Sequence, residues 1–234
     1  LIGDIDEETE GVSPVIKHLH FIQTLSNIIV VAIENLRLNQ ENIRQAAIRR
    51  ELELASRLQE MLIPDPEKLP ADNNMKVSAF YHPHMDVGGD YYDFISLGND
   101  SYGFCICDVS GKGISAAIIM SNFQANLRAL FTYDIPLDTL VSRLNDSVNE
   151  STKGERFLTM FIGKYDTETR EMIYINAGHN APLMYNIKSH VLTSLESNTV
   201  GIGMLDDMPP FEPRSIIMEK GVKLFCYTDG LVEI

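Results

Sequence analysis

The 234-residue chain has no tryptophan, only three cysteines, and far fewer basic than acidic residues. Lys and Arg number 19 against 33 Asp and Glu, which gives a formal net charge of −14. Nucleic acids and anionic membranes attract clustered positive charge, so the composition argues against a nucleic-acid partner and against membrane contact. The cysteines are spaced neither as a zinc site nor as a disulfide framework. Cys105 and Cys107 are expected as buried thiols on one face of a strand, in a reducing compartment.

Glycine and proline are absent from residues 15–63, although the chain has 15 and 10 of them in total. Pro14 follows Ser13, a pair typical of a helix start, and Pro64 ends the run. The sequence therefore predicts one helix of nearly fifty residues. Its apolar run Ile28 to Ile33 is much shorter than the roughly 20 residues that span a bilayer. No signal peptide opens the chain and the first residue is Leu, so we expect part of a longer, cytoplasmic protein.

Apolar residues in this helix recur in alternating steps of four and three, a seam that repeats every 3.5 residues as in coiled coils. The seam comprises Leu25, Ile29, Ala32, Leu36, Asn39, Ile43 and Ala46. A second phase, shifted by one position, comprises Ala47, Leu54, Leu58 and Met61. Residues 37–53 are too polar to be enclosed by a core, so we favour pairing with a second copy, a homodimer, over packing on its own domain.

After Pro64 the pattern changes to short strands interrupted by two helices. Expected helices cover 114–131 and 136–151. Expected strands cover 75–81, 90–97, 101–108, 157–165, 171–177, 182–186, 191–194, 214–218 and 223–228. Strands in runs, with the helices grouped between them, are typical of an α+β layered domain. We find no internal repeat.

Three aspartates in this region each follow an apolar run or a Gly-Gly pair and each stand beside small residues: Asp90, Asp108 and Asp229. Each alone could be a turn residue, the commoner role of Asp before Gly. Together they indicate carboxylates at the ends of three strands. Oxygen ligands of this kind suit Mg²⁺ and Mn²⁺, so the sequence predicts one metal site that the fold assembles, with the Val109 carbonyl beside Asp108.

Four ordered motifs resemble the metal-dependent PPM (type 2C) serine/threonine phosphatases, in particular their bacterial SpoIIE/RsbU-like branch. They are Val-Gly-Gly-Asp-Tyr-Tyr-Asp-Phe at 87–94, Asp-Val-Ser-Gly-Lys-Gly at 108–113, Ala-Gly-His-Asn-Ala-Pro at 177–182 and Tyr-Thr-Asp-Gly-Leu-Val-Glu at 227–233. The resemblance covers about residues 52–234. The stretch up to about Leu38 resembles, more weakly, the last helix of a GAF-type sensor domain.

The resemblance implies an αββα sandwich and three segments: a GAF remnant at 1–38, a helical linker at 39–63 and the phosphatase domain at 64–234. It also implies two Mn²⁺ or Mg²⁺ ions, with Asp108 bridging them, the Val109 carbonyl as a further ligand, Asp229 on one metal, and Asp90 on a metal or its water. The implied substrate is phosphoserine or phosphothreonine of a signalling protein, an anti-sigma-factor antagonist.

The family pattern has a further Asp on a strand beyond the Thr-Asp-Gly motif, and the sequence stops at Ile234, before that strand. A site that lacks this carboxylate is expected to bind metal weakly. For the same reason a dimeric scaffold without turnover stays open as an alternative.

Other polar residues near the motifs have two interpretations each. Lys112 is either a phosphate-steering residue or a solvated loop residue. His179 is expected as a buried, hydrogen-bonded loop residue, with general acid as the alternative. His82 and His84 are expected to be structural. Asp93 either assists the site or caps the following turn, and we favour the cap.

Overall fold

The computed structural model describes residues 14–71, 75–83, 86–132 and 134–232, so residues 1–13 and His84 lie outside the described part. Two compact units divide the chain, residues 1–52 and 53–234. The predicted linker and phosphatase boundaries at 38/39 and 63/64 stay predictions.

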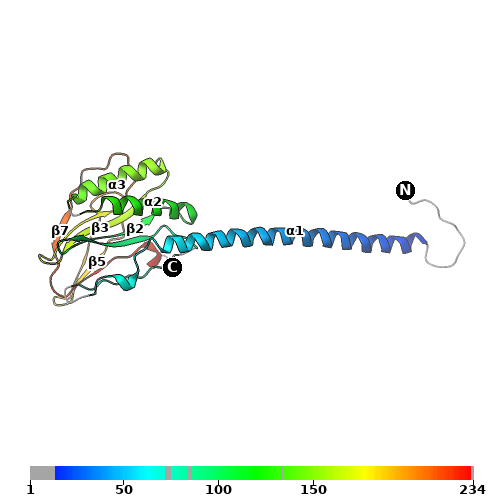
Figure 1. Ribbon diagram of the computed structural model, residues 1–234, viewed down its shortest axis with the longest axis horizontal. Coiled ribbons are helices and arrows are strands. Elements are labelled where there is room, and N and C mark those ends of the chain that lie inside the picture. Colours follow the sequence, from blue (N-terminus) through cyan, green and yellow to red (C-terminus); the bar gives the residue numbers. More distant parts are fainter. Residues whose placement is uncertain (1–13, 72–74, 84–85, 133, 233–234) are drawn as a thin grey trace. The chain divides into compact units, whose positions relative to one another are not determined.

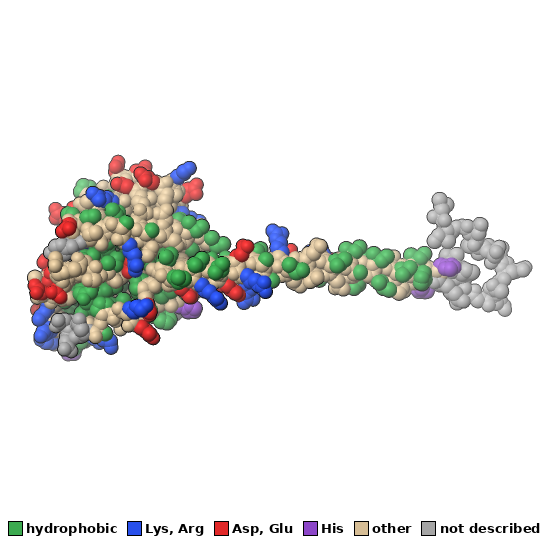
Figure 2. All heavy atoms as spheres, in the orientation of Figure 1, with side chains coloured by type: hydrophobic (Ala, Val, Ile, Leu, Met, Phe, Trp, Pro, Cys, Tyr) green, Lys and Arg blue, Asp and Glu red, His purple; other side chains and the backbone are tan. Residues whose placement is uncertain are grey.

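Helix α1 (Pro14–Glu60) runs through the stretch without glycine and proline, as predicted. Its end is tightened by the amide of Leu62, which donates to the Gln59 carbonyl at 2.9 Å, before Pro64 prevents further helix. The apolar seam residues that the structure describes are exposed; the Leu36 side chain, for example, is 65% accessible. Figure 2 shows these hydrophobic side chains along the part of α1 nearer the N-terminus.

Between His18 and Glu60, α1 holds an 18-residue stretch with a mean hydropathy of 1.3. By length and composition alone, this stretch could cross a membrane. The apolar part is therefore longer than the six-residue run at Ile28 to Ile33 suggested, because Leu19, Phe21 and Ile22 extend it on the N-terminal side.

The second unit is built on a five-stranded antiparallel sheet with the order β1-β2-β3-β4-β7. The strands are β1 (Tyr91–Gly98), β2 (Ser101–Val109), β3 (Leu158–Asp166), β4 (Glu171–Ala177) and β7 (Arg214–Ile217). A two-residue turn at Asn99 and Asp100 joins β1 to β2; both residues have positive φ, as the twist of a tight hairpin requires. The expected strands 90–97 and 101–108 pair as an antiparallel hairpin, and so do the expected strands 157–165 and 171–177.

Helices α2 (Ile114–Leu130) and α3 (Leu137–Thr152) lie on the same side of this sheet (Figure 1). Their apolar faces meet the sheet in the main core, where four residues on one face of α3 are buried, namely Leu137, Leu140, Val141 and Leu144. Cys105 and Cys107 point into the same core as free thiols, as predicted. Burial raises the pKa of the Cys107 thiol well above its usual value, so this thiol stays protonated.

The other face of the sheet packs against a three-stranded sheet with the order β6-β5-β8. Its strands are β5 (Leu183–Asn186), β6 (Val191–Ser194) and β8 (Val222–Phe225). A second core lies between the sheets, where Phe161 and Tyr174 of the first sheet pack near Leu224 of β8. The mixed fold of helices and antiparallel sheets is as predicted, but the outer helical layer of an αββα sandwich is not among the described elements.

One predicted strand is wrong. Residues 75–81 have strand-like alternation, yet only Lys76 forms an isolated bridge, with Ala71. The short helices η1 (Pro66–Lys68) and η2 (Asp229–Leu231) are the remaining described elements. Asp229 therefore lies in a helical turn four residues after β8 rather than at the strand end itself.

Candidate metal centre

The three predicted aspartates lie where three elements begin or end. Asp90 directly precedes β1, Asp108 is the last residue but one of β2, and Asp229 opens η2. Since side chains alternate along a strand, Asp108 faces away from the core that Cys107 and Val109 enter. It pairs in register with Thr159 of β3. All three aspartates are half-buried.

Asp90 is the point at which the three segments meet. Its Oδ2 accepts a hydrogen bond from the Thr228 hydroxyl at 2.9 Å, the residue before Asp229. Burial raises the pKa of Asp90, the Thr228 and Asp108 side chains lower it by hydrogen bonding, and the negative charge of Asp229 raises it again. The fold therefore brings Asp90 into contact with Asp108 and within electrostatic range of Asp229.

Gly89 allows this approach. A methyl group on Gly89 would lie 2.9 Å from the carbonyl oxygen of Val109 and 3.3 Å from the side chain of Ala116. Contacts this short are excluded between a carbon and a backbone oxygen, so only glycine lets the segment before Asp90 lie directly against the Val109 carbonyl. The predicted carbonyl ligand and the predicted carboxylates are thus neighbours.

Buried polar atoms without a partner are concentrated near this centre. Among the described residues three such atoms occur, the Tyr81 hydroxyl, His179 Nε2 and the Thr199 hydroxyl. Burial raises the pKa of Tyr81 to about 12, and the charge of Asp90 contributes to the rise. Burial lowers the pKa of His179, while the Tyr227 backbone and the charge of Asp229 raise it. Two of the three atoms therefore border the aspartate cluster, as expected around a site that takes further polar groups.

The donor set fits a hard cation in its chemistry, since it offers carboxylate and carbonyl oxygens with no thiolate. The described residues nevertheless contain no group of three His, Cys, Asp or Glu side chains close enough to hold an ion as they stand. Three carboxylates repel one another, and the Thr228 hydroxyl holds one oxygen of Asp90. Closing the cluster around an ion requires small side-chain movements.

Asp93 does not cap a turn, which corrects the prediction from the sequence. Its carboxylate is fully buried and receives two hydrogen bonds from the Arg128 guanidinium of α2, at 2.8 and 3.0 Å. The Tyr91 hydroxyl also bonds to it. Asp93 therefore joins β1 to α2 behind the site, while Lys112 and His82 are exposed.

Gln59 is a residue near the centre that the sequence does not point to. Its side-chain amide donates to the Gly88 carbonyl at 2.6 Å, and its carbonyl accepts from the Gly88 amide at 3.0 Å. Gln59 is buried near the end of α1, and both of its partners are backbone atoms. No spacing rule identifies a glutamine that binds a backbone 29 residues away.

Comparison with known proteins shows the family of this chain. Residues 98–234 match the family model described as stage II sporulation protein E (SpoIIE). Phosphoserine phosphatase RsbU of Bacillus subtilis is 29% identical over 189 residues, which cover 81% of this chain and 55% of RsbU. The chain thus spans about half the length of this curated relative.

Solved structures share the fold. The RsbU and RsbW domains of Rv1364c from Mycobacterium tuberculosis match with a TM-score of 0.56 and 26% identity, over 64% of this chain and 42% of that one. The SiaA-PP2C domain of Pseudomonas aeruginosa matches with a TM-score of 0.64 and 18% identity, over 80% and 73%. RsbX in complex with magnesium matches with a TM-score of 0.52 and 18% identity, over 62% and 68%. With more than half of its residues matched by the family model, the chain belongs to the SpoIIE family, whose fold is that of the PP2C phosphatases.

Proposed function

We propose that this protein is a metal-dependent phosphatase that hydrolyses phosphoserine or phosphothreonine in another protein. The observation that carries the proposal is the meeting of Asp90, Asp108 and Asp229 beside the Val109 carbonyl, in a chain related to a phosphoserine phosphatase. The substrate that we propose is a small phosphorylated signalling protein, an anti-sigma-factor antagonist, and the location is the cytoplasm.

Two Mn²⁺ or Mg²⁺ ions are the proposed cofactors. PP2C-type phosphatases are metal-dependent, and the RsbX structure contains magnesium. In this chain Asp108 would hold both ions, the Val109 carbonyl would be a further ligand, Asp229 would hold one ion, and Asp90 would hold an ion or its water. A bound pair of ions would supply a water of lowered pKa and neutralise charge on the transferring phosphoryl group.

The protein residues have separate tasks around that chemistry. The Thr228 hydroxyl fixes one oxygen of Asp90. Gly89 keeps the Val109 carbonyl accessible from the Asp90 side. The Asp93–Arg128 pair holds the start of β1 against α2. No nucleophilic side chain is required, because water is the attacking group.

The decisive experiment measures release of phosphate from a phosphoserine protein by the full-length protein, with and without Mn²⁺. We expect activity that needs Mn²⁺ and falls at least about a hundredfold in Asp108→Asn, since loss of this carboxylate removes a ligand of the ions that supply the chemistry. Asp146→Asn on α3 is the matched control. Partner binding without any turnover would instead support the dimeric scaffold.

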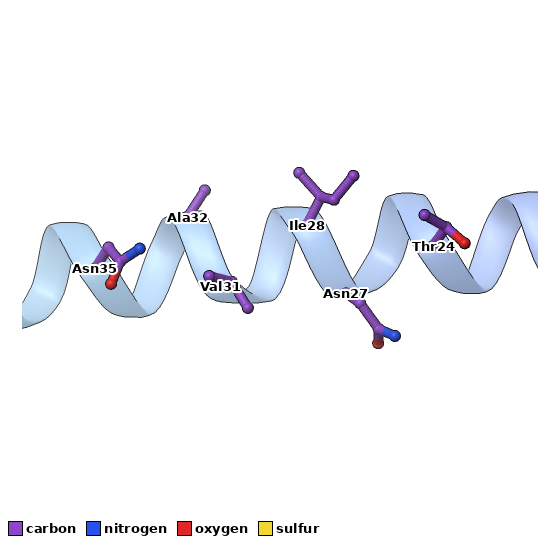
Figure 3. A pocket seen from close by; sticks show the side chains of 6 residues that line it. All are labelled: Thr24, Asn27, Ile28, Val31, Ala32 and Asn35. Atoms are coloured by element: carbon purple, nitrogen blue, oxygen red, sulfur yellow. The ribbon is translucent and has the colours of Figure 1, made fainter.

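The exposed seam of α1 supports a homodimer. Leu25, Ile29, Leu36 and Ile43 all lie on the seam and are all more than 40% accessible in the single chain. On a neighbouring face a shallow hollow of about 450 Å³ is lined by Thr24, Asn27, Ile28, Val31, Ala32 and Asn35 (Figure 3). A second copy of the helix would cover the seam, with Asn39 as the one polar position that sets the register.

Light scattering across a range of concentrations tests the dimer. The wild-type protein should double in mass and Leu36→Glu should stay monomeric, whereas Arg37→Glu, off the seam, should behave as wild type. Polar residues such as Gln23, Asn27 and Glu34 interrupt the apolar stretch, which favours a protein partner over lipid. Sedimentation of the wild-type protein with neutral vesicles, without self-association in solution, would overturn the dimer.

We further propose that α1 carries a signal from a GAF-type sensor, whose C-terminal remnant is residues 1–38, through a linker at 39–63 to the phosphatase domain at 64–234. The Gln59 contact to Gly88 supports a mechanical link, because it joins the end of α1 to the segment before Asp90. A helix breaker, Ala46→Pro, should change the activity and its Mn²⁺ dependence. If both stay unchanged, α1 is only a tether.

A further inference from the structure

His179 lies in the loop that follows β4 and is 5% accessible. Its backbone amide donates to Asn176 Oδ1 at 2.8 Å, and the fully buried Asn176 donates in turn to the Leu195 carbonyl at 3.0 Å. Gly178, with φ of +66°, makes the tight bend between them; a methyl group there would lie 3.0 Å from the Gly201 amide. The backbone at His179 is therefore fixed, and its ring has a defined direction.

One ring nitrogen is anchored to the strand pair that carries Asp108. His179 Nδ1 lies 2.7 Å from the Thr159 hydroxyl. Thr159 is the residue of β3 that pairs directly with Asp108 of β2. Cross-strand partners on one face of an antiparallel pair are about 5 Å apart, so a shift of Thr159 is passed to Asp108.

The other ring nitrogen faces the turn that carries Asp229. Nε2 is buried and has no partner of ordinary hydrogen-bond geometry in the described part of the chain. On this side, the Tyr227 backbone and the Asp229 carboxylate both favour the protonated ring. Thr228, between them, bonds to Asp90. The same short turn thus meets the His179 ring and two of the three aspartates.

The ring is neutral near pH 7. Burial lowers the pKa of His179 to about 4, although the Tyr227 backbone and the Asp229 charge oppose the shift. A neutral ring whose Nδ1 accepts from the Thr159 hydroxyl would carry its single proton on Nε2, the side on which the Tyr227 backbone lies. The alternative of a general acid stays a prediction.

We propose that His179 is a positioning residue that holds the Asp229 turn at a fixed distance from the Asp108–Thr159 strand pair, so that the two carboxylates reach the same cation. The proposal rests on the proposed metal centre and adds a residue to it. His179 touches neither the substrate nor the ion; it acts through Thr159 on one side and through the Tyr227 carbonyl on the other. Outer-sphere groups of this kind change metal affinity by about 10- to 100-fold.

The test measures Mn²⁺ affinity by titration calorimetry in the full-length protein and its variants, without any assay of turnover. His179→Phe keeps the volume of the ring and removes both nitrogens, so we expect affinity about tenfold weaker or more. Thr159→Val removes the hydroxyl and should weaken Mn²⁺ binding several-fold. Thr159→Ser keeps the hydroxyl and should bind Mn²⁺ as the wild-type protein does. His190→Phe is the matched control, because His190 also bonds to a hydroxyl through Nδ1, that of Tyr185, but is exposed.

Stability is measured separately by urea unfolding in EDTA. Met172→Ala, a substitution in the second core, should lower the unfolding free energy yet leave Mn²⁺ affinity unchanged. Equal Mn²⁺ affinity in His179→Phe and wild type would overturn the positioning role. If His179→Phe does not fold, the pair Thr159→Val and Thr159→Ser decides, and equal affinity in both overturns it.

Failure of the proposed function has a different signature. A wild-type protein whose Mn²⁺ binding does not change in Asp108→Asn has no metal centre at these aspartates, which overturns the proposed function and the role of His179 together. Binding that is lost in Asp108→Asn but kept in His179→Phe and Thr159→Val overturns the role of His179 alone.

Discussion

Individual side chains around the aspartate cluster carry charge in partly or fully buried places, and each charge is balanced in a different way. Asp93 has a cationic partner in Arg128 and a hydroxyl donor in Tyr91. Asp90 has one hydroxyl donor and two acidic neighbours. Burial without a cation is unfavourable to a carboxylate, so Asp93 stabilises the fold while Asp90 is held ready for a ligand that the fold itself does not supply.

Removing the partner of Asp93 should be costly. In Arg128→Met the fully buried carboxylate stays without its cation, and we expect the unfolding free energy to fall by about 2 kcal/mol. This figure lies below the usual range for buried pairs because the Arg128 side chain is 48% exposed and screened by water. Urea unfolding measures the change. The double variant with Asp93→Asn should recover part of the loss; strictly additive losses would show that the two side chains do not interact.

Replacing Asp90 should have the opposite effect on the metal-free protein. The folded state raises the pKa of this carboxyl, so its stabilising contribution is complete below the ordinary value of 3.8 and is lost as pH rises through the higher folded value. At neutral pH the ionised group therefore destabilises the fold, and Asp90→Asn, which still accepts from Thr228, should unfold at a higher temperature than wild type. Each kcal/mol gained would raise the midpoint by about 2–4 °C.

Thermal unfolding in EDTA at pH 7 and near pH 3 measures this difference, which should vanish at the lower pH. Asp146→Asn, at an exposed acidic residue on α3, is the control. A midpoint below that of wild type at pH 7 would contradict the expected sign. Phosphatase activity should be lost in Asp90→Asn in spite of its greater stability.

Helices and hairpins follow from local patterns, whereas contacts between them do not. The 3.6-residue period gave α2 and α3, and turn residues such as Asn99 gave the hairpin of β1 and β2, because both signals act within one element. The segment 75–81 has the alternation of a strand but no neighbour beyond the single bridge at Lys76. Gln59 and Asp93 were missed or misread for the same reason, since each finds its partner 29 or 35 residues away.

Gln59 offers a test of the coupling between α1 and the metal segment. Gln59→Ala removes both hydrogen bonds to Gly88, so the segment before Asp90 loses its anchor and we expect Mn²⁺-dependent activity to fall about tenfold, with a weaker Mn²⁺ affinity. Gln45→Ala is the matched control, because Gln45 lies on the same helix and bonds only to Glu41. Activity and affinity measured against Mn²⁺ concentration separate the two effects. Unchanged values in Gln59→Ala would mean that the contact only stabilises the end of α1.

Considered as a whole, the chain divides into a unit with two packed cores and a unit with none of its own. All the buried hydrophobic residues belong to the second unit, residues 53–234, among the residues whose burial the structure describes. The meeting of three distant aspartates at one end of the sheets could be predicted from their place after apolar runs. The sequence could not predict that the described carboxylates lie too far apart to hold an ion as they stand, because side-chain distances are not encoded in any pattern.

The two units should therefore unfold in separate steps. A helix whose apolar seam is uncovered is marginally stable in water, so α1 up to residue 52 should hold its helicity only through association with a second copy. Circular dichroism on heating should show a first loss of helix whose midpoint rises with protein concentration. A second transition, of the unit with the two cores, should not depend on concentration. Leu36→Glu should lower the first midpoint and remove its concentration dependence but leave the second transition unchanged. A single transition at every concentration would mean that α1 and the phosphatase unit are stabilised together, and the seam would then have its partner within the same chain.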